Sequence, residues 1–127
     1  MSAGALQEGL DGVAKGSGRE PREPGFLRFV CDALMPDTGL PNIADAEGQE
    51  AIEAALGEGD VLVLDNLSTL ARGLRENEAD DWGGLQAWLL RLRRRGKGVL
   101  LVHHAGKGGQ QRGTSRREDV LDTVIAL

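Results

Sequence analysis

Two short, almost continuous runs of apolar residues stand out in the second half of the chain. Val61 to Leu64 leads into Asp65, and Val99 to Val102 leads into His103 and His104. Apolar runs of this length are typical of parallel strands that are buried on both faces. Between them, apolar residues at helical spacing predict an amphipathic helix that ends near Gly96: Trp82, Leu85, Trp88, Leu89 and Leu92. Strand, helix and strand in this order predict an α/β fold.

The flanking segments add further predicted elements. Helical spacing of apolar residues predicts two helices, over residues 3–14 and 47–56. Aromatic and branched residues predict a strand over 26–30, and residues 120–127 predict another, although Asp122 and Thr123 interrupt its apolar run. Stretches rich in polar residues or glycine predict three loops: 16–25, Ser68–Asp81 and 105–117.

Length and composition exclude several classes of protein. A chain of 127 residues fits one domain and excludes a large multidomain enzyme. Its single cysteine, Cys31, excludes a disulfide framework and a cysteine-rich metal site. No apolar run approaches the roughly 18 residues of a membrane span, and no signal peptide opens the chain. We therefore expect a cytoplasmic protein with no membrane partner.

The net charge of −5 hides a division along the chain. Residues 1–90 carry −11, whereas residues 91–127 carry +6, and no acidic residue occurs within 91–117. The second part therefore predicts a basic edge that faces a polyanion such as a nucleic acid, although the whole chain is acidic. The alternative is a solvated basic helix end followed by a flexible loop.

Polar side chains follow both apolar runs, and ligands of open α/β sheets bind beyond the carboxyl ends of the strands. An aspartate in the place of Asp65 can hold Mg²⁺ through water, which is the Walker B role in nucleotide hydrolysis, or it can serve as a structural cap or turn residue. Because adjacent residues on a strand point to opposite faces, at most one of His103 and His104 can face the site. A zinc site has little support, since Cys31 and scattered carboxylates are the only other ligands.

The loop that follows the histidines combines glycines, amides, hydroxyls and cations, and such a loop can track a phosphate backbone. It contains no aromatic residue for base stacking, so it does not predict sequence specificity. Lys107 follows Gly106 but precedes Gly108, and the phosphate-loop pattern GxxxxGK[ST] occurs nowhere in these 127 residues.

Four segments together resemble one family in their order and spacing: Val61–Ser68, Glu76–Trp82, Leu101–Lys107 and Gln111–Asp122. They are similar to the RecA-like P-loop ATPases of plasmid and phage replication, which include RepA-type hexameric helicases and related AAA-type ATPases. This resemblance implies a three-layer fold with a mostly parallel sheet and flanking helices. It covers residues 60–127 densely and residues 41–56 more loosely.

The resemblance also implies roles for individual residues. Asp65 becomes the Walker B aspartate, which holds Mg²⁺ through water, and His103 or His104 becomes the sensor. The loops Ser68–Asp81 and Gly106–Arg117 match those that contact single-stranded DNA in the central channel of a homo-hexamer. The residues implied in DNA binding are Lys107, Arg112, Thr114, Ser115, Arg116 and Arg117.

Two parts of the family pattern have no counterpart in these residues: the Walker A strand with its loop, and the strand ending in the catalytic glutamate. We therefore expect a partial domain, with an acidic helical and edge-strand region over 1–59 and a Walker B, sensor and DNA-loop region over 60–127. ATP and Mg²⁺ serve the full-length family and are not expected to bind this chain alone. The missing strands would leave apolar edges, so we also expect the chain to rearrange, swap strands or associate.

Two other interpretations remain open at this point. The chain can be a nucleic-acid-binding or assembly module that uses the basic glycine-rich loop without hydrolysis. It can also be an independent small α/β domain unrelated to nucleotides.

Overall fold

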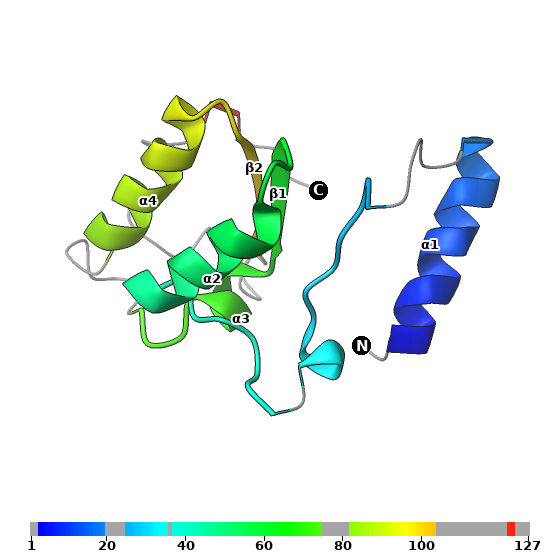
Figure 1. Ribbon diagram of the computed structural model, residues 1–127, viewed down its shortest axis with the longest axis horizontal. Coiled ribbons are helices and arrows are strands. Elements are labelled where there is room, and N and C mark those ends of the chain that lie inside the picture. Colours follow the sequence, from blue (N-terminus) through cyan, green and yellow to red (C-terminus); the bar gives the residue numbers. More distant parts are fainter. Residues whose placement is uncertain (1–2, 20–24, 36, 75–81, 104–121, 124–127) are drawn as a thin grey trace, which may run out of the picture. The chain divides into compact units, whose positions relative to one another are not determined.

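The computed structural model describes residues 3–19, 25–35, 37–74, 82–103 and 122–123 (Figure 1). The chain divides into two compact units, Met1–Leu40 and Pro41–Leu127, and we describe each by itself. No helix among the described residues is long and apolar enough to span a membrane.

The first unit contains two helical segments. Helix α1 spans Ala3–Ser17, which confirms the helix predicted over 3–14 and extends it by one turn. A short 3₁₀ helix, η1, spans Asp32–Leu34. The strand predicted over 26–30 is wrong, because these residues are irregular and exposed, with Phe26 at 65% exposure. Strand-forming residues need a neighbouring strand to satisfy their backbone groups, and the described part of this unit offers none.

The second unit is built around two parallel strands. Its elements are α2 (Ala46–Leu56), β1 (Val61–Asp65), α3 (Leu67–Leu70), α4 (Gly83–Arg94) and β2 (Gly98–Val102). Strand β1 pairs with β2 in the register Val61↔Gly98 to Asp65↔Val102. Both predicted strands and the helices predicted around them are therefore confirmed. Of the predicted loop Ser68–Asp81, the first residues belong instead to α3, and residues 75–81 lie outside the described part.

One face of the sheet packs against the helices and forms the core. Leu64 is 2% exposed, and Trp88 and Leu92 of α4 are fully buried. The other face differs from the sequence prediction of burial on both sides, because Val61, Val63 and Leu100 are 63%, 56% and 54% exposed. The second face of a parallel strand is exposed to solvent where no further layer covers it. No described residue of this unit covers that face.

A charged cluster joins α2 to α4 at the rim of this core. The indole Nε1 of Trp88 donates a hydrogen bond to Oε1 of Glu53 at 2.9 Å, and Arg95 pairs with the other carboxylate oxygen. Arg91 lies 3.8 Å from the same carboxylate. The Glu53 side chain is 23% exposed, so the cluster satisfies the buried indole nitrogen while its charges stay near water.

The residues just before α2 are hydrogen-bonded to the end of α3 and the residues after it. Asp45 caps α2 by accepting a hydrogen bond from the Gly48 amide at 2.8 Å. The Ile43 amide donates to the Leu70 carbonyl at 2.9 Å, and Nδ2 of Asn42 donates to the Arg72 carbonyl at 3.1 Å. Gly48 lets the first turn of α2 lie against the backbone of Asn42, because a Cβ at position 48 would lie 1.9 Å from the Asn42 carbonyl oxygen.

The fold class predicted from the sequence is confirmed. The second unit is α/β, with a parallel two-stranded sheet and flanking helices, and this arrangement is consistent with an incomplete RecA-like fold. The third strand predicted over 120–127 lies outside the described residues except for Asp122 and Thr123, which are not in a strand.

Replacing Gly48 with alanine is expected to lower the free energy of unfolding by about 1–3 kcal/mol, because the added methyl group overlaps backbone atoms that cannot move independently. Gly84→Ala is the matched control, since Gly84 lies in α4 with nothing within 4 Å of its Cβ position and should gain up to about 1 kcal/mol. Urea unfolding followed by circular dichroism measures both. Equal midpoints for Gly48→Ala and the parent chain would contradict the close approach.

Candidate functional site

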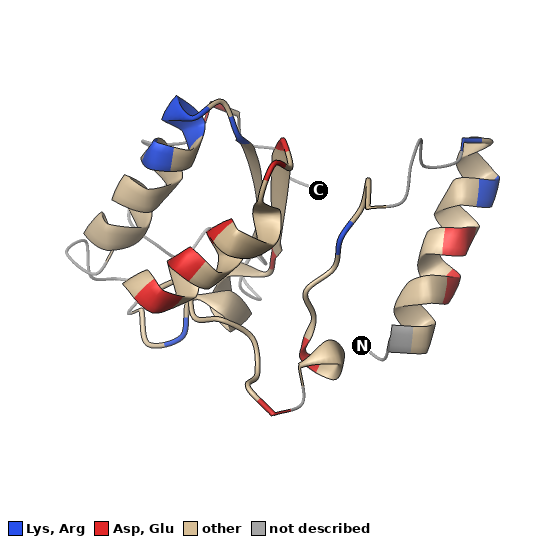
Figure 2. Cartoon of the chain, viewed as in Figure 1, with Lys and Arg blue, Asp and Glu red and all other residues tan. Residues whose placement is uncertain are grey.

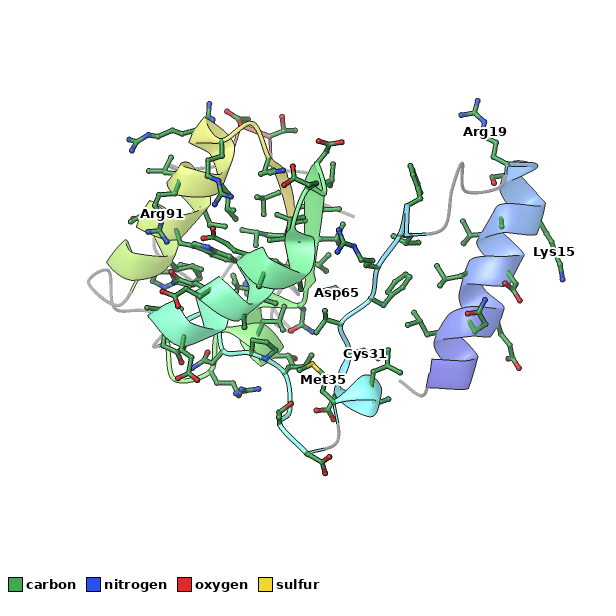
Figure 3. All side chains as sticks on the ribbon, viewed as in Figure 1. Lys15, Arg19, Cys31, Met35, Asp65 and Arg91 are labelled. Atoms are coloured by element: carbon green, nitrogen blue, oxygen red, sulfur yellow. The ribbon has the colours of Figure 1, made fainter. Side chains whose placement is uncertain are left out.

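The carboxyl ends of β1 and β2 meet at one end of the sheet. Asp65 is the last residue of β1 (Figure 3). It is paired in register with Val102, and His103 follows Val102 in the sequence. Neighbouring strands lie about 4.8 Å apart, so the sheet brings together two residues that are distant in sequence. The prediction that Asp65 and the start of the histidine pair share this end of the sheet is therefore confirmed.

Asn66, and not Asp65, caps the short helix that follows β1. Its Oδ1 accepts hydrogen bonds from the Thr69 amide at 3.0 Å, from the Thr69 hydroxyl at 3.0 Å and from the Ser68 hydroxyl at 2.7 Å. Three donors on one oxygen commit the amide oxygen of Asn66 to α3. The structural cap that the sequence allowed for Asp65 is thus supplied by its neighbour.

The Asp65 carboxylate is exposed at the end of its strand. No described residue donates a hydrogen bond to this carboxylate or forms an ion pair with it. The peptide bond between Asp65 and Asn66 is cis. A charged group left in water at the carboxyl end of a parallel strand is available to a ligand.

His103 lies at the same end of the sheet but on the other face. Strand alternation places Asp65 and Val102 on the exposed face and Leu101 and His103 on the face covered by helices. His103 is half-buried, and its Nδ1 atom is buried. Within the described part of the chain, no histidine shares the face of Asp65, and His104 lies outside that part.

The residues at this end fit Mg²⁺ only as a water-mediated site. Among the described residues, no group of three or more histidines, cysteines or acidic residues is placed to hold a metal ion. Mg²⁺ keeps several of its waters and needs only one or two carboxylates when a substrate phosphate supplies further oxygens. Asp65 meets this requirement as a single exposed carboxylate.

A shallow pocket lies beside α3 but does not suit a nucleotide. Its volume is about 120 Å³, well below the roughly 300 Å³ at which small-molecule sites begin. Its lining is mostly apolar: Leu67, Ser68, Ala71, Gly73, Leu74 and Trp82. The side-chain polar groups among these residues are the Ser68 hydroxyl, which donates to Asn66, and the Trp82 indole, and neither carries a charge that would attract a phosphate.

The described basic residues of 91–127 lie at the opposite end of the sheet. Helix α4 runs back along the strands, so its last turn lies where β1 and β2 begin (Figure 1), and Figure 2 shows the positive charges gathered there. Arg91 and Arg95 pair with Glu53, and Arg93 pairs with Asp122 at 2.7 Å. Arg91, Arg93 and Arg95 therefore form ion pairs within the chain, whereas the basic residues of 104–117 lie outside the described part, so the DNA-facing edge over 91–127 stays a prediction.

The remaining candidate residues lie outside the described part of the chain: His104, Lys107, Arg112, Thr114, Ser115, Arg116 and Arg117. Their proposed contacts with DNA therefore remain predictions. Arg72, which follows α3 at the same end of the sheet as Asp65, was not singled out from the sequence. Helix α3, which precedes Arg72, has four residues, and this is too short to produce a periodic pattern of apolar residues in the sequence.

Parallel strands and flanking helices define an α/β domain in which β1 ends at an exposed acidic residue. Comparison with protein families assigns it to an ATPase-like class, because the model of a family described as an AAA domain matches residues 14–110. The chain belongs to this AAA domain family. Searches among curated proteins and among solved structures gave no significant match.

Asn66→Ala is expected to lower the free energy of unfolding by about 1 kcal/mol, because it removes the cap of α3. Asp65→Asn changes the neighbouring residue and should alter that free energy by less than about 0.5 kcal/mol, since no described residue pairs with this carboxylate. Urea unfolding of both variants tests the division of roles. A loss in Asp65→Asn as large as that in Asn66→Ala would show that Asp65 is structural.

Proposed function

We propose that this chain carries the Walker B and sensor part of an ATPase domain of the RepA-type replicative helicase kind. The observation that supports this proposal most directly is the exposed Asp65 carboxylate, which stands at the carboxyl end of a parallel strand while Asn66 performs the capping. Membership of the AAA domain family agrees with it. In this proposal ATP hydrolysis is coupled to the binding of single-stranded DNA, and the chain acts as a homo-oligomer, a hexamer in the family that it resembles.

Asp65 is the residue that would hold Mg²⁺, through water, and the ion would neutralise charge on the nucleotide phosphates. One of His103 and His104 would then respond to the state of the nucleotide from the end of the adjacent strand, and His104 is the better candidate, because His103 lies on the face opposite Asp65. Asn66 holds the turn after β1 in place through its three hydrogen bonds. The backbone position from which the Asp65 side chain extends is therefore fixed.

The chain by itself is proposed not to hydrolyse ATP. The pattern GxxxxGK[ST], whose backbone amides and lysine bind the phosphates, does not occur in the 127 residues. Asp65 alone cannot replace it, because a carboxylate repels phosphate unless a cation lies between them.

The proposed DNA contact is the glycine-rich loop that follows β2. Residues 91–97 are not part of this proposal, because Arg91, Arg93 and Arg95 form ion pairs with carboxylates of the chain. The cations that follow the end of β2 in the sequence are Lys107, Arg112, Arg116 and Arg117, with no acidic residue among them. The same charge pattern supports the second candidate function, a nucleic-acid-binding or assembly module without hydrolysis.

Phosphate release from ATP by the purified chain is expected to equal that of its Asp65→Asn variant at every Mg²⁺ concentration. The reason is that the phosphate-binding pattern is missing from both proteins. A colorimetric phosphate assay with an enzyme-free blank provides the comparison. Hydrolysis that disappears in Asp65→Asn would disprove the claim that this chain is inactive alone.

Binding of fluorescent oligo(dT) is expected to weaken when Arg112, Arg116 and Arg117 are all replaced with alanine. The plot of log K against log salt concentration has a negative slope, and each lost phosphate contact makes it shallower by about 0.7. The loss of three contacts therefore makes it shallower by about 2. Fluorescence anisotropy at several salt concentrations measures this slope. The matched triple lysine variant keeps the charge and should keep most of the slope; unchanged binding by the alanine variant would reject the loop as the DNA contact.

A further inference from the structure

Helix α2 and its flanking residues are acidic, whereas the end of α4 is basic. Residues 45–60 contain six acidic residues and no basic one, and residues 91–97 contain five basic residues and no acidic one. Figure 2 shows these opposite charges on the two helices of the second unit. Among the described residues, Glu53 makes the only ion pairs between the two groups, with Arg91 and Arg95. Both groups therefore keep charges that have no ion pair in the described part of the chain.

On α2, two of these charges form an outer acidic face, Glu47 and Glu50. Helical spacing places both on the side of α2 away from Ile52, which is 6% exposed and packs in the core. Both glutamates are exposed, and neither side chain forms a hydrogen bond or an ion pair with another described residue. The exposed residues on the same side, Ala51 and Ala54, are small, so another molecule can approach these carboxylates closely.

On α4, the corresponding charges form a basic end, Arg94 and Lys97. Arg94 is exposed on the side of the helix away from Leu92, which is fully buried. The Lys97 amide donates a hydrogen bond to the Leu92 carbonyl at 3.0 Å, so the backbone that carries this lysine is fixed to the last turn of α4. No described residue accepts a hydrogen bond from either cationic side chain or pairs with it. Both charges are therefore available to a partner.

We propose that the basic end of α4 binds the outer acidic face of α2 in a second copy of this chain. This inference rests on the homo-oligomer of the proposed function and names one contact that would hold it together. Carboxylates of α2 and guanidinium groups of α4 already pair within one copy, at Glu53, Arg91 and Arg95. A second copy supplies the same chemistry to the side chains that this internal contact leaves unpaired.

The charges around the basic end favour a protein partner over a nucleic acid. Glu53 is shared by Arg91 and Arg95. Asp122 pairs with Arg93 at 2.7 Å, so two carboxylates lie among the arginines of this helix end. Polyanions favour a surface on which one sign of charge prevails. A mixed surface instead suits a partner that carries opposite charges at defined positions, as α2 does.

Sedimentation velocity of the parent chain over a range of protein concentrations provides the first test. At about 0.1 M salt the Debye length is about 10 Å, and the weight-average mass is expected to rise with protein concentration. At about 1 M salt the Debye length shortens to about 3 Å, and the mass should fall to that of a single chain. Association through exposed apolar residues would not weaken with salt in this way, so salt-independent association would contradict the contact.

Charge reversal tests the two partners of the contact. Arg94→Glu and Glu50→Arg are each expected to weaken association at least about tenfold, because each places like charges opposite one another. An equal mixture of the two variants should recover the parent behaviour, since Glu50 of one variant meets Arg94 of the other and the two reversed residues also attract each other. Lys15→Glu and Glu8→Arg in α1 are the matched controls, because they change the net charge equally and should leave association unchanged.

Folding of each variant is checked by circular dichroism and urea unfolding. Arg94→Lys is the conservative variant, which keeps the charge and should associate like the parent chain. A loss of association in Lys15→Glu as large as that in Arg94→Glu would show a general effect of net charge and would overturn the contact.

Other results would overturn the contact and differ in what they leave standing. Association that neither reversal weakens would reject this contact and keep the homo-oligomer. Weakening by both reversals without recovery in the mixture would show that Arg94 and Glu50 do not face each other. An Arg94→Glu variant that associates like the parent but loses oligo(dT) binding would assign the basic end to DNA. A parent chain that stays monomeric at low salt would reject the contact together with the homo-oligomer of the proposed function.

Discussion

Two strands that run in the same direction cannot be joined by a tight turn, so the chain between β1 and β2 must travel back along the sheet. Residues 66–97 do this, with α4 as the returning helix. This constraint places Asp65 and His103 at one end of the sheet and the arginines of α4 at the other. The pairing of β1 with β2 therefore decides which charged residues can act on the same ligand.

The helices are held to each other as well as to the sheet. Trp88 fills the centre of the core without any exposed surface, and its indole nitrogen would lack a protein acceptor if Glu53 did not receive its hydrogen bond. The same carboxylate takes the charge of Arg95. Arginine-rich helix ends are therefore not evidence of nucleic-acid binding until their partners are known, because here the acidic helix α2 supplies one.

Sequence patterns predicted the regular elements of the second unit well. The spacing of Leu85, Trp88 and Leu92 marks a helix because only a helical period of 3.6 residues brings these three side chains to one face. Helix α3 escaped prediction because four residues are too few for a period, and its signal is a cap that either Asp65 or Asn66 can provide. The strand predicted over 26–30 failed because strand propensity describes a residue's fit to a sheet, and whether a neighbouring strand exists is not a local property.

The amino-acid sequence by itself determined the fold class, the two apolar strands, their polar ends and the uneven charge along the chain, since all of these depend on periodicity and composition. Only the tertiary structure decided that Asn66 is the cap and Asp65 is left exposed, because adjacent residues with similar side chains compete for the same amides. It also decided that Arg91, Arg93 and Arg95 pair with carboxylates at the end of the sheet opposite Asp65, since the return of the chain through α4 brings its last turn back to where the strands begin.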